Sequence, residues 1–165
     1  MSREILFKAK DKDDGRWYEG YYMCLHDTTH GAMPSDDPAE VKRLEEENTH
    51  HYIVFERMTD WELPNQHLRV EILPETLCQY TGLTDKNGKK IWENDIVLKS
   101  DVNPLGWNRT RNCKVLFTNS GYWSLLTEYG DGYWVGEFER EQLEVIGNIF
   151  DNPELLRGED DGKTD

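Results

Sequence analysis

Short apolar runs separated by turn residues dominate the chain from residue 76 onward. The runs are TLCQY, KKIWE, DIVLK, CKVLFT, GYWSLLTEY, GYWVGEF and LEVIGNI, and pairs such as Asn-Gly, Asn-Asp and Ser-Gly lie between them. Runs of this length with such punctuation are typical of β-strands joined by tight turns. The pattern therefore predicts a small barrel or paired antiparallel sheets.

The first half of the chain carries further strand signals and one helix signal. Residues 4–8, 17–23, 51–58 and 68–73 have the length and alternation of strands, and Asp14-Gly15 suits a hairpin turn between the first two. Residues 36–48 begin with capping residues followed by Pro38, a typical helix start. Only Val41 and Leu44 form an apolar stripe there, so we expect one short, acidic, peripheral helix.

Length and aromatic content indicate how the core is filled. The chain has 165 residues, of which 12% are aromatic, and its overall hydrophobic share is only 36%. A few large side chains are therefore expected to fill the interior of one mainly β domain over residues 1–157. The tail GEDDGKTD at residues 158–165 is polar and acidic, and we expect it to be disordered. Residues 152–156 are predicted to form one helical turn.

The net charge of the chain limits the classes of molecule that it is expected to bind. The net charge is -14, which opposes contact with phosphate backbones and with anionic lipid, so direct nucleic-acid binding is not expected. No apolar run reaches the roughly 18 residues of a membrane span. The three cysteines, Cys24, Cys78 and Cys113, are far apart in the sequence, as expected for reduced thiols. We expect a cytoplasmic protein.

The stretch QYTGLTDKNGKKIWENDIV at residues 79–97 resembles the signature of the YopX family of bacteriophage and prophage proteins. REILFKAKD near the start, VEILPETLCQY before the signature and VIGNIFDNPELL near the end are similar to further parts of that family. Asn94 stands where the family usually has Gly, and Asn tolerates the left-handed backbone conformation that such a turn requires. Residues 27–48 and 100–111 are not covered by the pattern.

The resemblance implies a mainly β phage or prophage protein in a bacterial cytoplasm, and it implies no activity. We expect a non-enzymatic accessory protein that binds a host or phage protein or associates with itself. Aromatic side chains that reach the surface are the usual anchors of protein interfaces. One alternative is a small enzyme acting on a nucleotide or another small anionic substrate. Another is an acidic competitor of a host nucleic-acid-binding protein, because carboxylates can occupy an Arg/Lys groove.

The strongest candidate for metal binding is Cys24, His26 and His30. A tetrahedral site would take a fourth ligand from elsewhere, such as Asp27, His50 or His51. Paired Cys spacing and a His-Glu helix motif are both absent, so the sequence favours a loop edge that contains histidines. We assign no metal, cofactor or catalytic residue.

The other candidates also favour structural roles. Glu93 and Asp95 lie two residues apart, as acid/base catalysis could use, but the polar surroundings favour a turn in which Asp95 binds backbone amides after Asn94. Cys78 has apolar neighbours and is expected in the core. The Gly130-Asp131-Gly132 sequence lacks the context of a phosphate loop and is expected at a hairpin tip.

Tryptophans complete the list of candidates. The segment from Trp107 to Arg111 is the basic-aromatic patch that could stack on a base, although the net charge argues against it. Trp107 has polar neighbours in a predicted loop and is the tryptophan most expected at the surface. Most of the others are predicted in the core; they are Trp17, Trp61, Trp92, Trp123 and Trp134.

Overall fold

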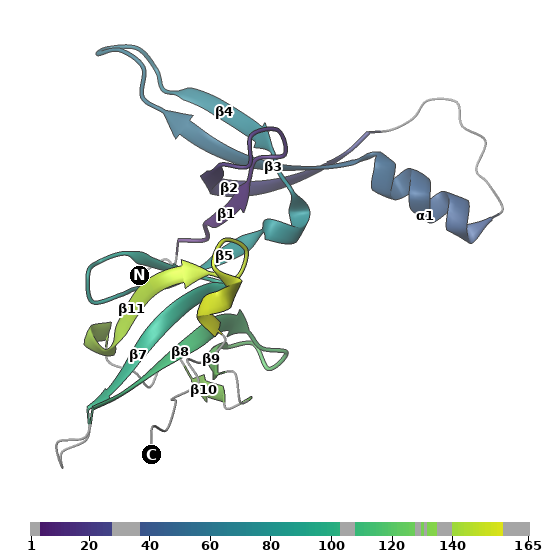
Figure 1. Ribbon diagram of the computed structural model, residues 1–165. Helices are drawn as coiled ribbons and strands as arrows, with labels where there is room; N and C mark the ends of the chain where they lie inside the picture. Colours follow the sequence, from purple (N-terminus) through teal and green to yellow (C-terminus); the bar gives the residue numbers. More distant parts are fainter. Residues whose placement is uncertain are drawn as a thin grey trace. The chain divides into compact units, whose positions relative to one another are not determined.

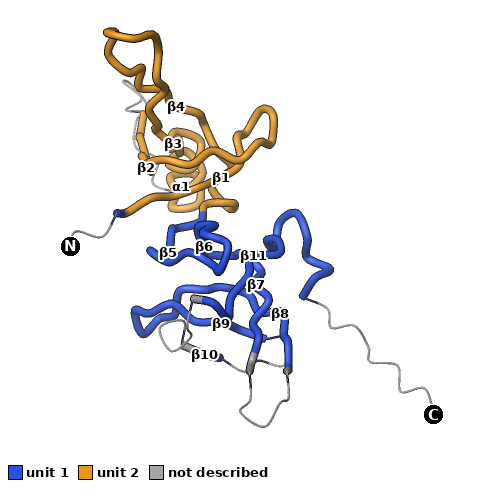
Figure 2. Tube along the Cα trace, turned by 90° about the vertical axis from the view of Figure 1, so that its left-hand side faces the viewer, with its two compact units in different colours: residues 1–4, 78–165 blue, residues 5–77 orange. Residues whose placement is uncertain are grey.

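The computed structural model describes residues 4–27, 37–102, 108–127, 130, 132–134 and 140–156. The chain folds as two compact units, one of residues 5–77 and one of residues 1–4 with 78–165 (Figure 2). The division into two units does not test whether residues 1–157 form one domain, so that stays a prediction. The predicted disorder of residues 158–165 lies outside the described residues.

The unit of residues 5–77 is built on an antiparallel sheet with the strand order β4-β3-β2-β1 (Figure 1). Its elements are β1 (Phe7–Lys10), β2 (Trp17–His26), α1 (Pro38–Glu47), β3 (Thr49–Arg57), β4 (Gln66–Glu71) and the 3-10 turn η1 (Pro74–Thr76). The predicted turn at Asp14-Gly15 connects β1 to β2, and Gly15 has the positive φ of 70° that such turns require.

This sheet curls so that its two outer strands meet at one end. Asp11, just after β1, forms a β-bridge with Ile72, just after β4. On either side of the bridge, the amide of Lys12 donates to the carbonyl of Glu71 and the amide of Leu73 donates to that of Lys10, both at 2.9 Å. The curled face encloses the buried side chains Ala9, Ile53 and Ile72, with aromatic and aliphatic neighbours around them.

The helix α1 starts as the sequence predicts. The Asp37 side chain caps it by accepting a hydrogen bond from the amide of Ala39 at 3.0 Å, and Pro38 follows in the first turn. Val41 and Leu44 are only half-buried, and no residue of α1 is buried. Among the described residues, none of the helices has both the length and the apolar character that crossing a bilayer requires.

The second unit contains a β-hairpin and a five-stranded antiparallel sheet with the order β10-β9-β8-β7-β11. Its strands are β5 (Cys78–Thr84), β6 (Lys90–Trp92), β7 (Asp95–Val102), β8 (Asn108–Phe117), β9 (Trp123–Thr127), β10 (Gly132–Trp134) and β11 (Leu143–Asn148). The turns η3 (Arg140–Gln142) and η4 (Pro153–Leu156) flank β11. The core is formed by Ile91, Val97, Cys113, Val115, Trp123, Leu125, Leu143 and Val145.

The mainly β fold, the antiparallel sheets and the short helix are confirmed. Of the two predicted architectures the paired sheets are correct, because among the described residues no sheet closes into a barrel. Two strand boundaries differ from the prediction: β1 begins three residues later and ends two residues later, and β2 continues three residues past Met23 because it pairs with β3. Residues 100–102 and 108–110, which the family pattern did not cover, pair with each other in the β7–β8 hairpin.

Three residues of the 79–97 stretch, Gly82, Gly88 and Asn94, have a positive φ. Asn94 has a φ of 63°, so it adopts the left-handed conformation that the sequence predicted for it. In the turn between β5 and β6, the amide of Gly88 donates to the carbonyl of Asp85 at 3.0 Å, and Gly88 has a φ of 82°. This confirms the tight turn that the Asn87-Gly88 pair predicts between two strands.

Asp85 is the residue that joins this turn to the sheet. Its side chain is buried, and one carboxylate oxygen accepts from the amides of Asn87 and Lys89 at 2.8 and 2.9 Å. The other oxygen accepts from the amide of Val145 in β11 at 3.0 Å. Burial by itself raises the pKa of Asp85, but the hydrogen bonds from these backbone amides outweigh it and hold the pKa below its usual value.

We expect Asp85→Asn to lower the free energy of unfolding by about 1.5–3 kcal/mol, the range for a buried hydrogen bond to a charged group. The Asn carbonyl can still accept from the turn, whereas its NH2 group can face the amide of Val145, so two donors meet. Urea unfolding followed by circular dichroism measures the change. The exposed Asp13→Asn is the matched control and should stay within about 0.5 kcal/mol of the wild type.

The same carboxylate makes stability depend on pH in a defined direction. Because the folded-state pKa of Asp85 is lowered, its contribution is present above its unfolded pKa of about 3.9 and is lost as pH falls through the folded value. The difference in unfolding free energy between wild type and Asp85→Asn should be constant above about pH 5 and shrink below about pH 4. A difference that grows on acidification would contradict this account.

Candidate functional site

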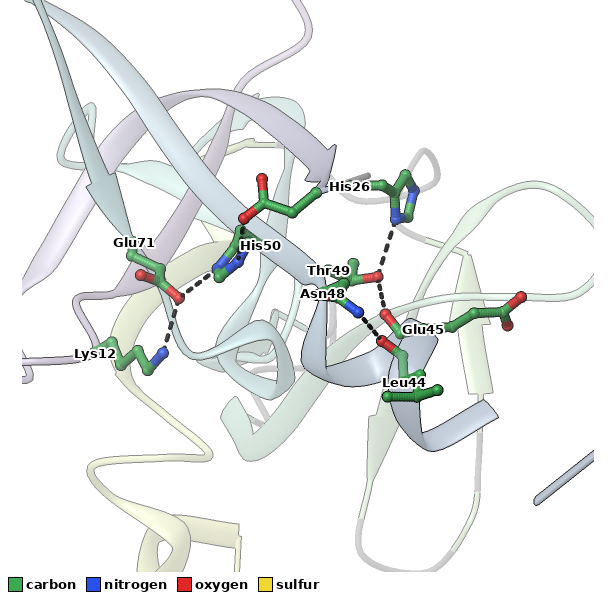
Figure 3. Close-up of polar contacts among 9 residues, drawn as sticks. Lys12, His26, Leu44, Glu45, Asn48, Thr49, His50 and Glu71 are labelled. Atoms are coloured by element: carbon green, nitrogen blue, oxygen red, sulfur yellow. Dashed lines mark hydrogen bonds and ion pairs between the residues drawn. The ribbon is translucent and has the colours of Figure 1, made fainter. Parts of the chain in front are cut away.

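A set of polar and charged side chains crosses one end of the sheet in the unit of residues 5–77 (Figure 3). Lys12 Nζ lies 2.8 Å from Glu71 Oε1, and the same oxygen lies 3.2 Å from His50 Nδ1. The other ring nitrogen of His50 lies 3.4 Å from Asp27 Oδ2. These contacts tie the β1–β2 turn, β3, β4 and the end of β2 together.

The network has the electrostatics of a structural ion pair. The hydrogen bond from Lys12 is the main cause that lowers the pKa of Glu71, and the hydrogen bond with His50 adds to it. The same contact with Glu71 raises the pKa of Lys12. Both shifts stabilise the charged forms, so neither group is prepared to exchange a proton near neutral pH.

A second set of contacts fixes the junction between α1 and β3. The Thr49 hydroxyl donates to the carbonyl of Glu45 at 2.5 Å and lies 2.9 Å from His26 Nδ1. Asn48 Nδ2 donates to the carbonyl of Leu44 at 2.6 Å. His26 therefore contacts the residue at which the helix passes into the strand (Figure 3).

The proposed metal ligands are only partly brought together. Cys24 and His26 lie in β2 rather than in a loop, with Cys24 Sγ 3.9 Å from His26 Nε2. His51 instead lies 2.7 Å from the hydroxyl of Tyr22. Within the described residues no group of three or more His, Cys, Asp or Glu could hold a metal ion, and His30 lies outside them.

Glu93 and Asp95 both contact the backbone. Asp95 is buried, and its Oδ2 accepts from the amide of Trp92 at 2.9 Å, which lies just before Asn94. Glu93 Oε2 lies 3.4 Å from the amide of Gln79. Their surroundings are those of a turn, as the sequence predicted, because one carboxylate oxygen of each residue is directed to a backbone donor.

The remaining candidates have mixed outcomes. Cys78 is fully buried and accepts a hydrogen bond from Asn94 Nδ2 at 3.7 Å, which confirms its core position. Gly130 has a φ of 85°, suited to a turn, while Asp131 lies outside the described residues. Trp107 also lies outside them, and Arg109 is exposed on β8.

Among the described residues, the most exposed large apolar side chains lie at the tip of the β3–β4 hairpin, residues 58–65. Trp61 is 94% exposed, Met58 81% and Leu63 62%. Trp92 and Trp123, by contrast, are buried as predicted. Trp61 is therefore an exception to the prediction that most of the tryptophans lie in the core. A Trp inside a short connection marked by Pro64-Asn65 was the signal that could have revealed it.

The hairpin carries this tip beyond its neighbouring strand. The pairing of β3 with β2 ends at Val54, opposite Tyr21, whereas β3 and β4 continue to pair as far as Arg57 opposite Gln66. Figure 1 shows β3 and β4 extending as a two-stranded ribbon that ends in the loop. The apolar side chains of the tip therefore lie away from the enclosed core of their unit.

Comparison with known proteins found a matching family and a similar solved structure. The sequence model of the family described as YopX protein matches residues 6–157. The chain is similar to the crystal structure of protein EF1440 from Enterococcus faecalis, with 21% identity, a TM-score of 0.45, and coverage of 94% of this chain and 99% of that one. No curated protein matches the sequence.

The exposure of Trp61 predicts that it contributes almost nothing to folding. We expect Trp61→Ala to change the free energy of unfolding by less than about 0.5 kcal/mol, as for other surface substitutions. Trp92→Ala, in the interior, should lower it by about 3–5 kcal/mol. Urea unfolding measures both, and iodide quenching of tryptophan fluorescence should fall in Trp61→Ala. A large loss of stability in Trp61→Ala would show that the tip is packed.

Proposed function

The chain belongs to the YopX protein family, and on this basis we propose that it is a non-enzymatic phage or prophage protein that binds a protein partner in the bacterial cytoplasm. The observation that supports the proposal is the hairpin tip, where Trp61 is almost fully exposed beside Met58 and Leu63. We propose that this tip is the docking element.

Exposed aromatic side chains at such a position are costly unless a partner covers them. A Trp can bury roughly 150–250 Å² in a contact, and Trp is among the residues that contribute most to binding energy. Met adds a flexible apolar surface that adapts to a partner. Since Trp61 is hardly in contact with the core, binding is the role that accounts for its position.

Catalysis on a small anionic substrate is less well supported. Glu93 and Asp95, the carboxylates best spaced for acid/base work, are directed to the backbone amides of Gln79 and Trp92. The net charge of -14 favours instead a narrower version of binding, in which the acidic surface competes for the DNA-binding cleft of a host protein. That version predicts binding to a basic protein that weakens with salt.

Photocrosslinking tests the docking role of the tip. We expect benzoylphenylalanine at position 61 to crosslink one protein species in lysate of the bacterium that encodes the chain, because the large aromatic side chain still fits the partner. The same group at Tyr21, an exposed aromatic in β2, is the matched control. Excess unlabelled wild-type protein should remove the crosslinked species, while excess Trp61→Ala should not.

Three outcomes of that experiment are informative. A crosslinked species that wild-type protein removes and Trp61→Ala leaves in place supports the docking role. Equal crosslinking from positions 61 and 21, or equal competition by both proteins, rejects it. A species of twice the mass of the chain would make self-association the function.

A further inference from the structure

We infer that the partner surface recognised by the hairpin tip is an apolar pocket bordered by Lys or Arg side chains. This inference rests on the proposed docking function and adds the chemistry of the partner. It follows from the apolar side chains at the tip, the order of the tip backbone, and the charges on either side of Trp61.

The backbone of the tip is held by its own hydrogen bonds. The amide of Leu63 donates to the carbonyl of Asp60, and the Thr59 hydroxyl donates to the carbonyl of Pro64, both at 3.1 Å. The amide of Trp61 donates to Asp60 Oδ1 at 3.2 Å. Glu62 adopts a φ of 73°, which turns the chain between Trp61 and Leu63. Such a loop presents Trp61 with little ordering left to be done on binding.

Order of this kind points to a pocket rather than to a flat surface. A single Trp at the end of a narrow ribbon contributes most when its whole ring enters a cavity, where water is excluded around it. Met58 and Leu63, on either side of the turn, would contact the apolar walls. The partner therefore needs a concave apolar site that accepts one indole ring.

The charges set the border of that site. Trp61 stands between Asp60 and Glu62, and both acidic residues are exposed. Glu56, the next acid along β3, accepts from Asn65 Nδ2 at 3.0 Å and so is engaged within the hairpin. When Trp61 enters a pocket, Asp60 and Glu62 must lie at its rim. Cationic groups there would attract them, whereas acidic groups would oppose the approach.

The same acids disfavour other occupants. A bilayer with anionic headgroups would repel Asp60 and Glu62 as Trp61 approached it. A second copy of the chain carries a net charge of -14 and would repel the tip on approach. The charges at the tip therefore complement a basic protein surface better than either alternative.

The experiment uses the full chain with benzoylphenylalanine at position 61 in the same lysate, and heparin serves as a polyanion probe that occupies cationic protein surfaces. We expect the crosslink from position 61 that excess wild-type protein removes to fall roughly 2- to 30-fold when Asp60→Asn and Glu62→Gln are combined, as for the loss of one or two exposed ion pairs. It should fall similarly when salt is raised from about 50 to about 500 mM or when heparin is added.

The control carries the same change in charge at another place. Asp13→Asn combined with Glu45→Gln also removes two exposed carboxylates, and it should leave the crosslink unchanged. The inference is overturned if the crosslink persists but ignores salt, heparin and the tip variant, or if both double variants weaken it equally. It is also overturned if the species is a dimer of the chain, or if the protein sediments with anionic vesicles through Trp61. If position 61 gives no crosslink that wild-type protein removes and Trp61→Ala leaves in place, the docking function itself is rejected.

Discussion

The unit of residues 78–165 depends on one buried carboxylate. Asp85 lies in the β5–β6 turn, yet one of its oxygens accepts from the amide of Val145, which is 60 residues away in β11. A buried carboxylate is tolerated only when donors surround it, and the amides of Asn87 and Lys89 supply the others. The turn therefore forms with its full set of hydrogen bonds only when β11 is in place, which couples local geometry to the sheet. This coupling gives a structural reason for the regular order of turn residues and short apolar runs in the 79–97 stretch.

The unit of residues 5–77 depends instead on a sheet that curls around a small core. Its buried core is small, with Ala9, Ile53 and Ile72 at its centre, and the bridge between Asp11 and Ile72 curls the sheet around them. The strands β3 and β4 continue to pair past Val54, which is where β3 stops pairing with β2. The end of their hairpin therefore lies outside the curl. The same strands thus enclose a core at one end and present apolar side chains to solvent at the other. The binding role that we propose uses the second end.

The polar clusters connect the secondary-structure elements of the unit of residues 5–77. Lys12, Glu71 and His50 connect turn and strands, and the pKa shifts of the first two stabilise their charged forms. His26 contacts Thr49 at the helix-to-strand junction. His50 and His51 are adjacent in β3 and therefore point to opposite faces of the strand, which separates these two of the proposed ligands.

Sequence alone determined the family, the mainly β class, the capped helix at Pro38 and the left-handed Asn94, because turns, caps and strand alternation are local properties. It also placed Cys78 in the core. Only the tertiary structure decided that Asp85 binds β11 and that Trp61 is exposed, since both depend on which strands pair and how far the pairing runs. The hydrophobic character of a Trp favours burial. Whether Trp61 is buried depends on its position in the connection between β3 and β4, and the core does not extend to that position.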